Sequence, residues 1–94
     1  MSEINKRQQG LEYDSSANEI EQEYLSCKKL CFKINQLPVD DLKRRDLFKE
    51  LLGSIGENFY MGANFSCDVG KNITINEDFF GNDNITILDN FHNI

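Results

Sequence analysis

Residues 61–94, MGANFSCDVGKNITINEDFFGNDNITILDNFHNI, carry an apolar residue at nearly every sixth position in two registers. One register holds Met61, Cys67, Ile73, Phe79, Ile85 and Phe91, and a second holds Ala63, Val69, Ile75, Gly81 and Ile87. The third odd-numbered register, Phe65, Lys71, Glu77, Asp83 and Asp89, is mostly charged and is expected to face outward. A half-buried strand would keep all three registers apolar, because its side chains alternate with period two. The pattern instead predicts a chain that turns a corner every six residues, as in a parallel β-helix of hexapeptide repeats.

Gly81 occupies an inward position of the second register. Two interpretations of this glycine stay open. It leaves room for the bulky Phe79 or Phe80, or it marks a place where a ligand approaches the backbone closely.

The residues before this repeat have the period of helices. A weak amphipathic stretch, Ile4 to Leu11, precedes Ser16-Ala17-Asn18-Glu19, which matches a helix capping box. The apolar stripe of the helix that follows is expected to consist of Ile20, Tyr24, Cys27, Cys31 and Ile34. The helix should end in Asn35-Gln36-Leu37-Pro38, because the residue before proline is disfavoured in the α conformation.

A second helix is expected to start near Val39-Asp40-Asp41, whose carboxylates suit the positive end of a helix dipole. Its apolar face is predicted to hold Leu47, Phe48, Leu51, Leu52 and Ile55. Gly53 is predicted to be its left-handed C′ residue. The fold class predicted is therefore mixed α and β, with an antiparallel helical hairpin in residues 1–56 and the first coils of a β-helix in residues 57–94. The hairpin is expected to cover one end or one flank of the β-helix.

Length and charge narrow the function classes. The chain has 94 residues, a net charge of −6 and 39% hydrophobic residues, which fits one small domain with a packed core. The negative charge argues against nucleic-acid binding, which needs a basic face. No apolar signal segment follows the first residues, and no apolar run approaches the ~20 residues of a membrane-spanning helix. We therefore expect a cytoplasmic protein with neither nucleic-acid nor membrane partners.

The three cysteines, Cys27, Cys31 and Cys67, do not suggest a disulfide framework in a reducing compartment. Cys27 and Cys31 are four residues apart on one face of the predicted first helix. A metal site would need further Cys or His nearby, and the one histidine, His92, is far away in sequence. We interpret the cysteines as buried free thiols and expect no metal site.

Several segments match one known family in order along nearly the whole chain. They are residues 10–14, the helix ending at Asn35, residues 50–54, residues 65–73 and, most strongly, residues 76–89, NEDFFGNDNITILD. In these segments the chain resembles the N-terminal part of the maltose and galactoside O-acetyltransferases, a family that includes the nodulation acetyltransferase. The resemblance implies a left-handed β-helix and a homotrimer with active sites between subunits. It also implies transfer of an acetyl group from acetyl-CoA to a sugar hydroxyl.

The resemblance assigns roles to five positions. Asp14 corresponds to an acidic residue that binds the acceptor sugar, and a carboxylate suits hydrogen bonds from sugar hydroxyls. Asp68, Phe80 and Asn90 also fall on acceptor-contacting positions, and Asn82 falls on an asparagine at the acetyl-CoA end of the site. Where the family often carries an arginine in the first helix this chain has Tyr24, and Asn90 replaces an aspartate of some members.

No catalytic residue is expected within the 94 residues, because the family's catalytic histidine falls beyond position 94 and His92 lacks its flanking residues. The first hypothesis is therefore a sugar O-acetyltransferase of the maltose, galactoside or glucose type, truncated and inactive alone. Its partners would be the sugar acceptor and either a homotrimer or a complementing chain. The alternative is a non-enzymatic interaction or assembly module that pairs through an open β-helix edge.

Overall fold

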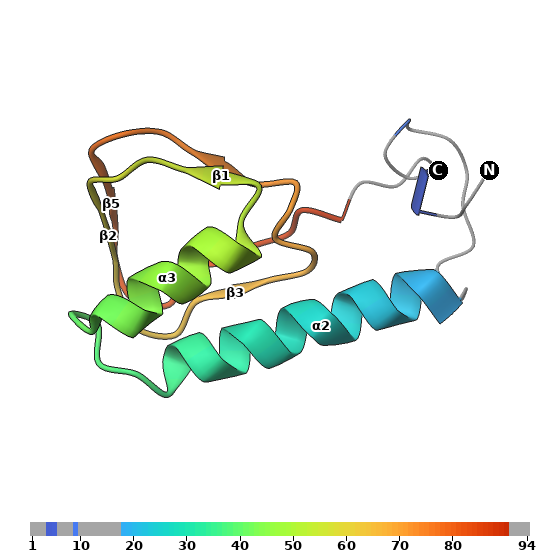
Figure 1. Cartoon of the computed structure of the whole chain (residues 1–94), viewed down its shortest axis with the longest axis horizontal. Helices are drawn as coiled ribbons and strands as arrows, with labels where there is room; N and C mark the ends of the chain where they lie inside the picture. Colours follow the sequence, from blue (N-terminus) through green and yellow to red (C-terminus); the bar gives the residue numbers. More distant parts are fainter. Residues whose placement is uncertain (1–3, 6–8, 10–17, 91–94) are drawn as a thin grey trace.

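The computed structural model describes residues 4, 5, 9 and 18–90 (Figure 1). The elements in the range 18–90 are α2 (Asn18–Asn35), α3 (Leu42–Leu51), β1 (Ser54–Ile55), β2 (Phe59–Met61), β3 (Ser66–Cys67), β4 (Thr74–Ile75), β5 (Phe79–Gly81) and β6 (Thr86–Ile87). Most of the predicted stretch from Ile4 to Leu11, and the capping-box residue Ser16, lie outside the described residues.

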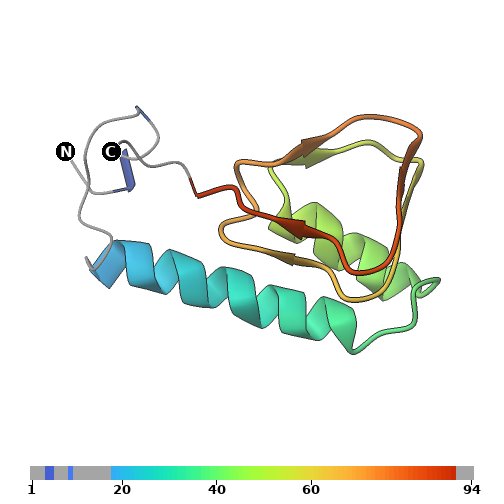
Figure 2. The same cartoon turned by 180° about the vertical axis from the view of Figure 1, so that it is seen from behind.

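The six strands form two stacked turns of a left-handed parallel β-helix. Each strand of the first turn pairs in parallel with one strand of the second, as β1–β4, β2–β5 and β3–β6. Figures 1 and 2 show the triangular coil from its two ends, with the second turn stacked on the first. The predicted fold class, a helical hairpin followed by coils of a β-helix, is confirmed.

The coil is longer than three strict hexapeptides. Phe59 pairs with Phe79 and Met61 with Gly81, so that residues 20 apart stack. The prediction that the whole third register faces outward is wrong at two positions, because Phe65 is 1% exposed and Asp89 is 4% exposed. The corners are uneven, because the segment from β3 to β4 is longer than the others and contains Gly70 with a φ of +88°. Asp89 is buried because its carboxylate accepts hydrogen bonds from N–H groups in that segment.

Stacked asparagines stabilise one corner of the coil. Asn64 and Asn84 both have positive φ values, of 64° and 61°, which asparagine tolerates better than most residues. The Asn64 side-chain amide donates to the Asn84 side-chain oxygen at 2.9 Å. The corner therefore repeats from one turn to the next at both the backbone and the side-chain level.

The first helix buries most of its predicted stripe. Ile20, Cys27, Cys31 and Ile34 are buried, and α2 ends at Asn35 as predicted. The prediction for Tyr24 is wrong, because its side chain is 46% exposed and lies beside the Lys28 ammonium. Figure 1 shows that the first turns of α2 extend past the coil.

The second helix, α3, starts at a side-chain N-cap and ends where the backbone becomes extended. Asp41 is its N-cap, and the side chain accepts a hydrogen bond from the Lys43 N–H at 2.8 Å. The prediction of a left-handed Gly53 is wrong, because Leu52 already turns to extended φ and ψ of −83° and 156°. The chain passes directly into β1, which begins at Ser54. Gly53 is required for another reason, since a Cβ there would clash with the Lys71 carbonyl oxygen.

The helices and the coil share one hydrophobic core. α3 crosses the first turn of the coil at one end, antiparallel to α2, and α2 lies along β3 (Figures 1 and 2). Phe48 of α3 is fully buried, with its ring edge-on to Phe59 at 6.0 Å and to Phe65 at 5.1 Å. Because both helices bury apolar surface on the coil, the division at residue 56 stays a prediction.

Arg44 joins the two helices to the coil. Its side chain is 3% exposed, and burial lowers the pKa of the guanidinium. It donates to the carbonyl oxygens of Ile34 at 3.3 Å, Met61 at 2.6 Å and Gly62 at 2.5 Å. A buried cation is therefore satisfied by backbone dipoles from α2 and from the corner after β2.

Candidate functional site

An exposed aromatic pair marks the outer face of β2 and β5. Phe80 is 67% exposed and stacks on Tyr60, with ring centroids 5.0 Å apart and an interplanar angle of 14°. Both residues occupy the single outward position of their strands. Gly81 and Phe79 on either side face inward, and a Cβ at Gly81 would meet Phe79, Met61 and Ile85. Gly81 therefore makes room for core side chains, as one of its two interpretations predicts.

Asn82 follows β5 at the start of the next corner and is exposed. Its neighbour Asp83 fixes that corner, because the carboxylate accepts a hydrogen bond from the Ala63 N–H at 2.8 Å. Phe80 and Asn82 are two residues apart on β5 and its continuation. The structure thus brings these two predicted site residues to one edge of the coil.

Asp68 and Asn90 lie near the other end of the β3–β6 face. Between them Asp89 clamps the corner, because its carboxylate accepts hydrogen bonds from the N–H groups of Asp68, Val69 and Gly70 at 3.1, 2.9 and 2.7 Å. Asp68 is half-buried and lies 4.0 Å from the Lys28 ammonium, and Asn90 is exposed. Asp14 lies outside the described residues.

The predicted site residues thus fall into two pairs within one chain. Phe80 lies on the β2–β5 face and Asn82 at the corner that leads from β5 toward β6, whereas Asp68 and Asn90 lie just after β3 and β6. Tyr60 belongs with the first pair and was not predicted. Its position 20 residues before Phe80 would have revealed it, had the length of the coil been known.

A shallow pocket of about 260 Å³ opens beside Tyr60. It lies between the start of α3 and β2, and it is lined by Val39, Asp40, Arg44, Arg45, Phe48, Phe59, Tyr60 and Met61. The Arg45 guanidinium lies 4.4 Å from the Phe59 ring centroid and donates to the Phe59 carbonyl oxygen at 3.0 Å. The aromatic pair is therefore continuous with a hollow that presents a cationic group.

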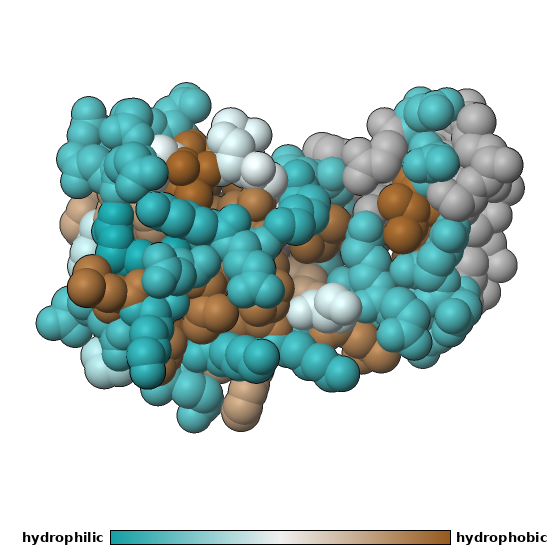
Figure 3. Space-filling view, in the orientation of Figure 1, coloured by the Kyte–Doolittle hydropathy of each residue, from teal (hydrophilic) through white to brown (hydrophobic). Residues whose placement is uncertain are grey.

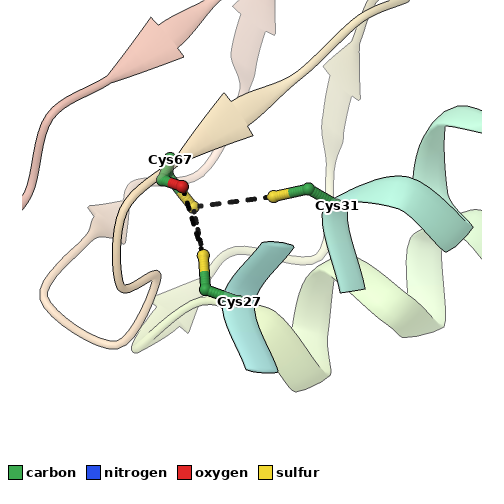
Figure 4. A group of neighbouring side chains, drawn as sticks. All are labelled: Cys27, Cys31 and Cys67. Carbon is green, nitrogen blue, oxygen red and sulfur yellow. Dashed lines mark hydrogen bonds between the residues drawn. The ribbon is translucent and has the colours of Figure 1, made fainter. Parts of the chain in front are cut away.

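The three cysteines converge beneath α2. Cys67 Sγ lies 3.4 Å from Cys27 Sγ and 4.0 Å from Cys31 Sγ, and all three residues are buried and free of disulfides (Figure 4). The prediction of buried free thiols is confirmed. The sequence did not reveal their convergence, because Cys67 comes from β3, 36 residues after Cys31.

The thiols affect one another's ionisation. Hydrogen bonding from Cys27, and then from Cys67, lowers the pKa of Cys31. The hydrogen bond with Cys31 raises the pKa of Cys27, against a smaller lowering by Cys67, and hydrogen bonds with Cys27 and Cys31 raise the pKa of Cys67. Burial adds to both increases. The cluster therefore releases a first proton more readily than a second or a third.

The face seen in Figure 3 is largely hydrophilic, with hydrophobic residues between the polar ones. A shallow groove on the outer surface of α2 is lined by Leu25, Lys28, Lys29, Phe32 and Lys33. Neither of the long helices in the range 18–90 combines the length and the apolar character needed to cross a membrane.

Comparison with known proteins places the chain among acetyltransferases. Residues 6–56 match the family described as the maltose acetyltransferase hexapeptide capping motif. The galactoside O-acetyltransferase of Escherichia coli K12 is 34% identical over 65 residues, which are 68% of this chain and 32% of that protein.

Two solved structures are similar over nearly the whole chain. One is a hexapeptide-repeat acetyltransferase from Vibrio cholerae in complex with acetyl-CoA, with a TM-score of 0.84 and 34% identity over 97% of this chain and 49% of that one. The other is a maltose O-acetyltransferase from Clostridium difficile, with a TM-score of 0.88 and 33% identity over 95% of this chain and 48% of that one.

The chain therefore belongs to the maltose acetyltransferase family of hexapeptide-repeat proteins. It spans less than half the length of the curated relatives it matches. The matched half contains the helical cap and the coils that adjoin it.

Proposed function

We propose that this chain supplies the acceptor side of a cytoplasmic sugar O-acetyltransferase, which transfers an acetyl group from acetyl-CoA to a hydroxyl of a maltose-, galactoside- or glucose-type sugar. The observation that carries the proposal is the close match of the helical cap and both coils to solved acetyltransferases, one of them bound to acetyl-CoA. In this proposal Asp14, Asp68, Phe80 and Asn90 contact the sugar. Asn82 contacts acetyl-CoA.

The exposed chemistry of these residues suits a sugar. Apolar faces of sugar rings pack well on an exposed aromatic ring, and Phe80 presents such a ring, held flat by Tyr60. Carboxylate and amide oxygens accept hydrogen bonds from hydroxyls, which is the role proposed for Asp68 and Asn90.

The separation of the two pairs supports a site shared between subunits. Phe80 sits on the β2–β5 face with Asn82 at the corner after it, whereas Asp68 and Asn90 sit just after β3 and β6. In a homotrimer, which we propose for the whole enzyme, the first pair of one subunit would face the second pair of its neighbour. One sugar could then contact both.

The reaction needs a base that the proposed site residues do not supply. As the sugar oxygen attacks the thioester carbonyl, its proton must pass to a base, the new C–O bond forms, the C–S bond breaks and the coenzyme A thiolate leaves and is protonated. A positioned histidine contributes ~10²–10⁴-fold to such a step. We propose that residues 1–94 bind the acceptor, and that the base and most of the acetyl-CoA groove come from further coils.

A chimera tests whether this chain binds the acceptor while further coils supply the base. Replacing the equivalent segment of the Clostridium difficile maltose O-acetyltransferase with this chain should give an enzyme that acetylates a sugar, detected as the acetylated product by mass spectrometry. The 94-residue chain alone should give no product above the uncatalysed rate. A folded, trimeric chimera without acetyl transfer would contradict the proposed acceptor role, and robust turnover by the chain alone would contradict the proposed need for further coils.

A second candidate function rests on the outer edge of the second coil. Among the described strands, β4, β5 and β6 each have one neighbour, so their other edges carry backbone groups able to pair with another strand. This edge favours an assembly module that joins another β-helix chain. Light scattering on the purified chain checks this candidate, because it predicts heteromers or higher oligomers, and a stable monomer at all concentrations would argue against it.

A further inference from the structure

The only group of three or more potential metal ligands that clusters in the described part of the chain is formed by Cys27, Cys31 and Cys67. Their Sγ atoms all lie within 4.8 Å of one another. Figure 4 shows the side chains of Cys27 and Cys31, one turn apart on α2, pointing toward the Cys67 side chain of β3. Packing explains why each thiol is buried, but it does not require three sulfurs to meet at one point.

The spacing of the sulfurs fits a three-coordinate metal ion. A metal–thiolate bond of ~2.3 Å places the sulfurs of a trigonal site ~4.0 Å apart. Two of the three separations, from Cys67 Sγ to Cys27 Sγ and to Cys31 Sγ, are 3.4 and 4.0 Å, and all three are within 4.8 Å. The separations are therefore close to those that a trigonal site requires.

The kind of ligand selects the kind of ion. Thiolates prefer soft ions such as Cu(I), whereas structural zinc sites are almost always four-coordinate. Within the range 18–90 no fourth Cys, His, Asp or Glu side chain joins the cluster. The donor set of three sulfurs thus favours Cu(I) over Zn(II).

The Lys28 ammonium can offset the negative charge that metal binding would create at the three thiolates. Cu(I) would displace the three thiol protons to solvent as three Cu–S bonds form, which leaves a net negative charge in the core. This ammonium lies beside the cysteine cluster and donates to the Cys67 carbonyl oxygen at 3.0 Å. The Cys27 thiol also donates to that oxygen at 3.2 Å, so Lys28 would keep the carbonyl satisfied after the thiol loses its proton.

We propose that Cys27, Cys31 and Cys67 form a three-thiolate binding site for a soft metal ion, with Cu(I) as the best match. The site is buried under α2 and adjoins one proposed acceptor residue, Asp68, which follows Cys67 and lies 4.0 Å from the Lys28 ammonium. An ion there would tie α2 to β3 and so fix the helical cap on the β-helix.

Competition for Cu(I) under anaerobic conditions tests the proposal with the full chain. The reduced protein, with three free thiols verified by labelling after denaturation, is titrated into the complex of Cu(I) with bicinchoninate. We expect the chain to withdraw one Cu(I) per molecule, and X-ray absorption of the loaded protein to show three sulfur ligands. Failure to withdraw copper, or a spectrum with two sulfurs or with nitrogen or oxygen ligands, would overturn the proposal.

Substitutions assign the ligands. Cys27→Ala, Cys31→Ala and Cys67→Ala should each weaken Cu(I) binding at least 100-fold, whereas Ile34→Val, a change in the same core one turn along α2, should leave it unchanged. Equal copper binding by any of the three alanine variants would contradict the assignment. If Cys67→Ala fails to fold, the absorption spectrum of the unaltered protein still decides the sulfur count.

A zinc titration tests whether the site prefers Cu(I) to Zn(II). Zn(II) is expected to bind more weakly than Cu(I) and to be displaced by one equivalent of Cu(I). Retention of Zn(II) against Cu(I) would overturn the choice of ion.

Discussion

Tyr60 and Phe80 stack face to face across the two coils, with ring centroids 5.0 Å apart, although both rings are exposed. Each ring covers part of the other. The pair therefore stabilises the coil as well as forming the aromatic surface that we propose for the sugar.

The stack predicts a moderate loss of stability in Phe80→Ala. An aromatic pair contributes ~0.5–1.5 kcal/mol beyond its burial, so the free energy of unfolding should fall by about 1 kcal/mol in a urea titration. Asp78→Ala is unsuitable as a control because Asp78 has a φ of 60° and accepts a hydrogen bond from the Asn58 amide. Leu88→Ala is a better one, because Leu88 is 78% exposed and should change stability by less than ~0.5 kcal/mol.

Removing the buried guanidinium of Arg44 should have the largest effect. Arg44→Met leaves the carbonyl oxygens of Met61 and Gly62 without this donor, and each unsatisfied buried group costs ~1–3 kcal/mol. We expect a loss of at least about 3 kcal/mol by urea denaturation. Lys43→Met, at an exposed position of the same helix, should stay within ~0.5 kcal/mol. A similar loss in both variants would show that Arg44 does not hold the helices to the coil.

The three hydrogen bonds accepted by Asp89 predict that its substitution lowers stability more than substitution of Asp83. Asp89→Asn replaces a carboxylate that accepts three backbone N–H groups, whereas Asp83→Asn affects one such bond at an exposed corner. Hydrogen bonds to charged groups contribute ~1.5–3 kcal/mol, so Asp89→Asn should cost about 2 kcal/mol. Asp83→Asn should cost about 0.5 kcal/mol at an exposed position. Thermal unfolding of both variants checks the order, and an equal or reversed order would contradict the clamp.

Gly53→Ala tests the close approach of the chain after α3 to the second coil. A Cβ at residue 53 would clash with the backbone carbonyl of Lys71, and the backbone must shift to relieve it. We expect a loss of about 2 kcal/mol or more, measured by urea denaturation, within the range of strongly destabilising backbone changes. The neighbouring Ser54→Ala, at an exposed position, serves as the control and should be nearly neutral. A neutral Gly53→Ala would mean that the two segments are not in contact.

The fold was predictable because its signals are local and repeated. The six-residue register predicted a β-helix, Pro38 predicted the end of α2, and Asp40 and Asp41 predicted the start of α3. The length of the coil was not predictable, because it depends on corners of unequal length, such as the longer segment from β3 to β4 that contains Gly70. The burial of Asp89 was missed because it depends on hydrogen bonds with N–H groups of the preceding turn, at Asp68, Val69 and Gly70. Gly53 was misread because a C′ glycine and a glycine at a close approach look alike in sequence.

The candidate site was predictable only where residues lie close in sequence. The family resemblance suggested Phe80 and Asn82, and the structure places both on β5 and its continuation. Tyr60 was missed because its partner Phe80 is 20 residues later, and the convergence of Cys67 with Cys27 was missed because the two are 40 residues apart. Only the stacking of coils and the packing of α2 on β3 bring these pairs together.

The central claim is that the chain binds the sugar acceptor, and two substitutions in the maltose O-acetyltransferase chimera test it most directly. Steady-state kinetics with the sugar varied and then with acetyl-CoA varied should separate the roles. Phe80→Ala should raise KM for the sugar at least tenfold, equivalent to ~1.4 kcal/mol, with KM for acetyl-CoA nearly unchanged. Asn82→Ala should act mainly on KM for acetyl-CoA. Unchanged sugar KM in a folded Phe80→Ala chimera would contradict the account.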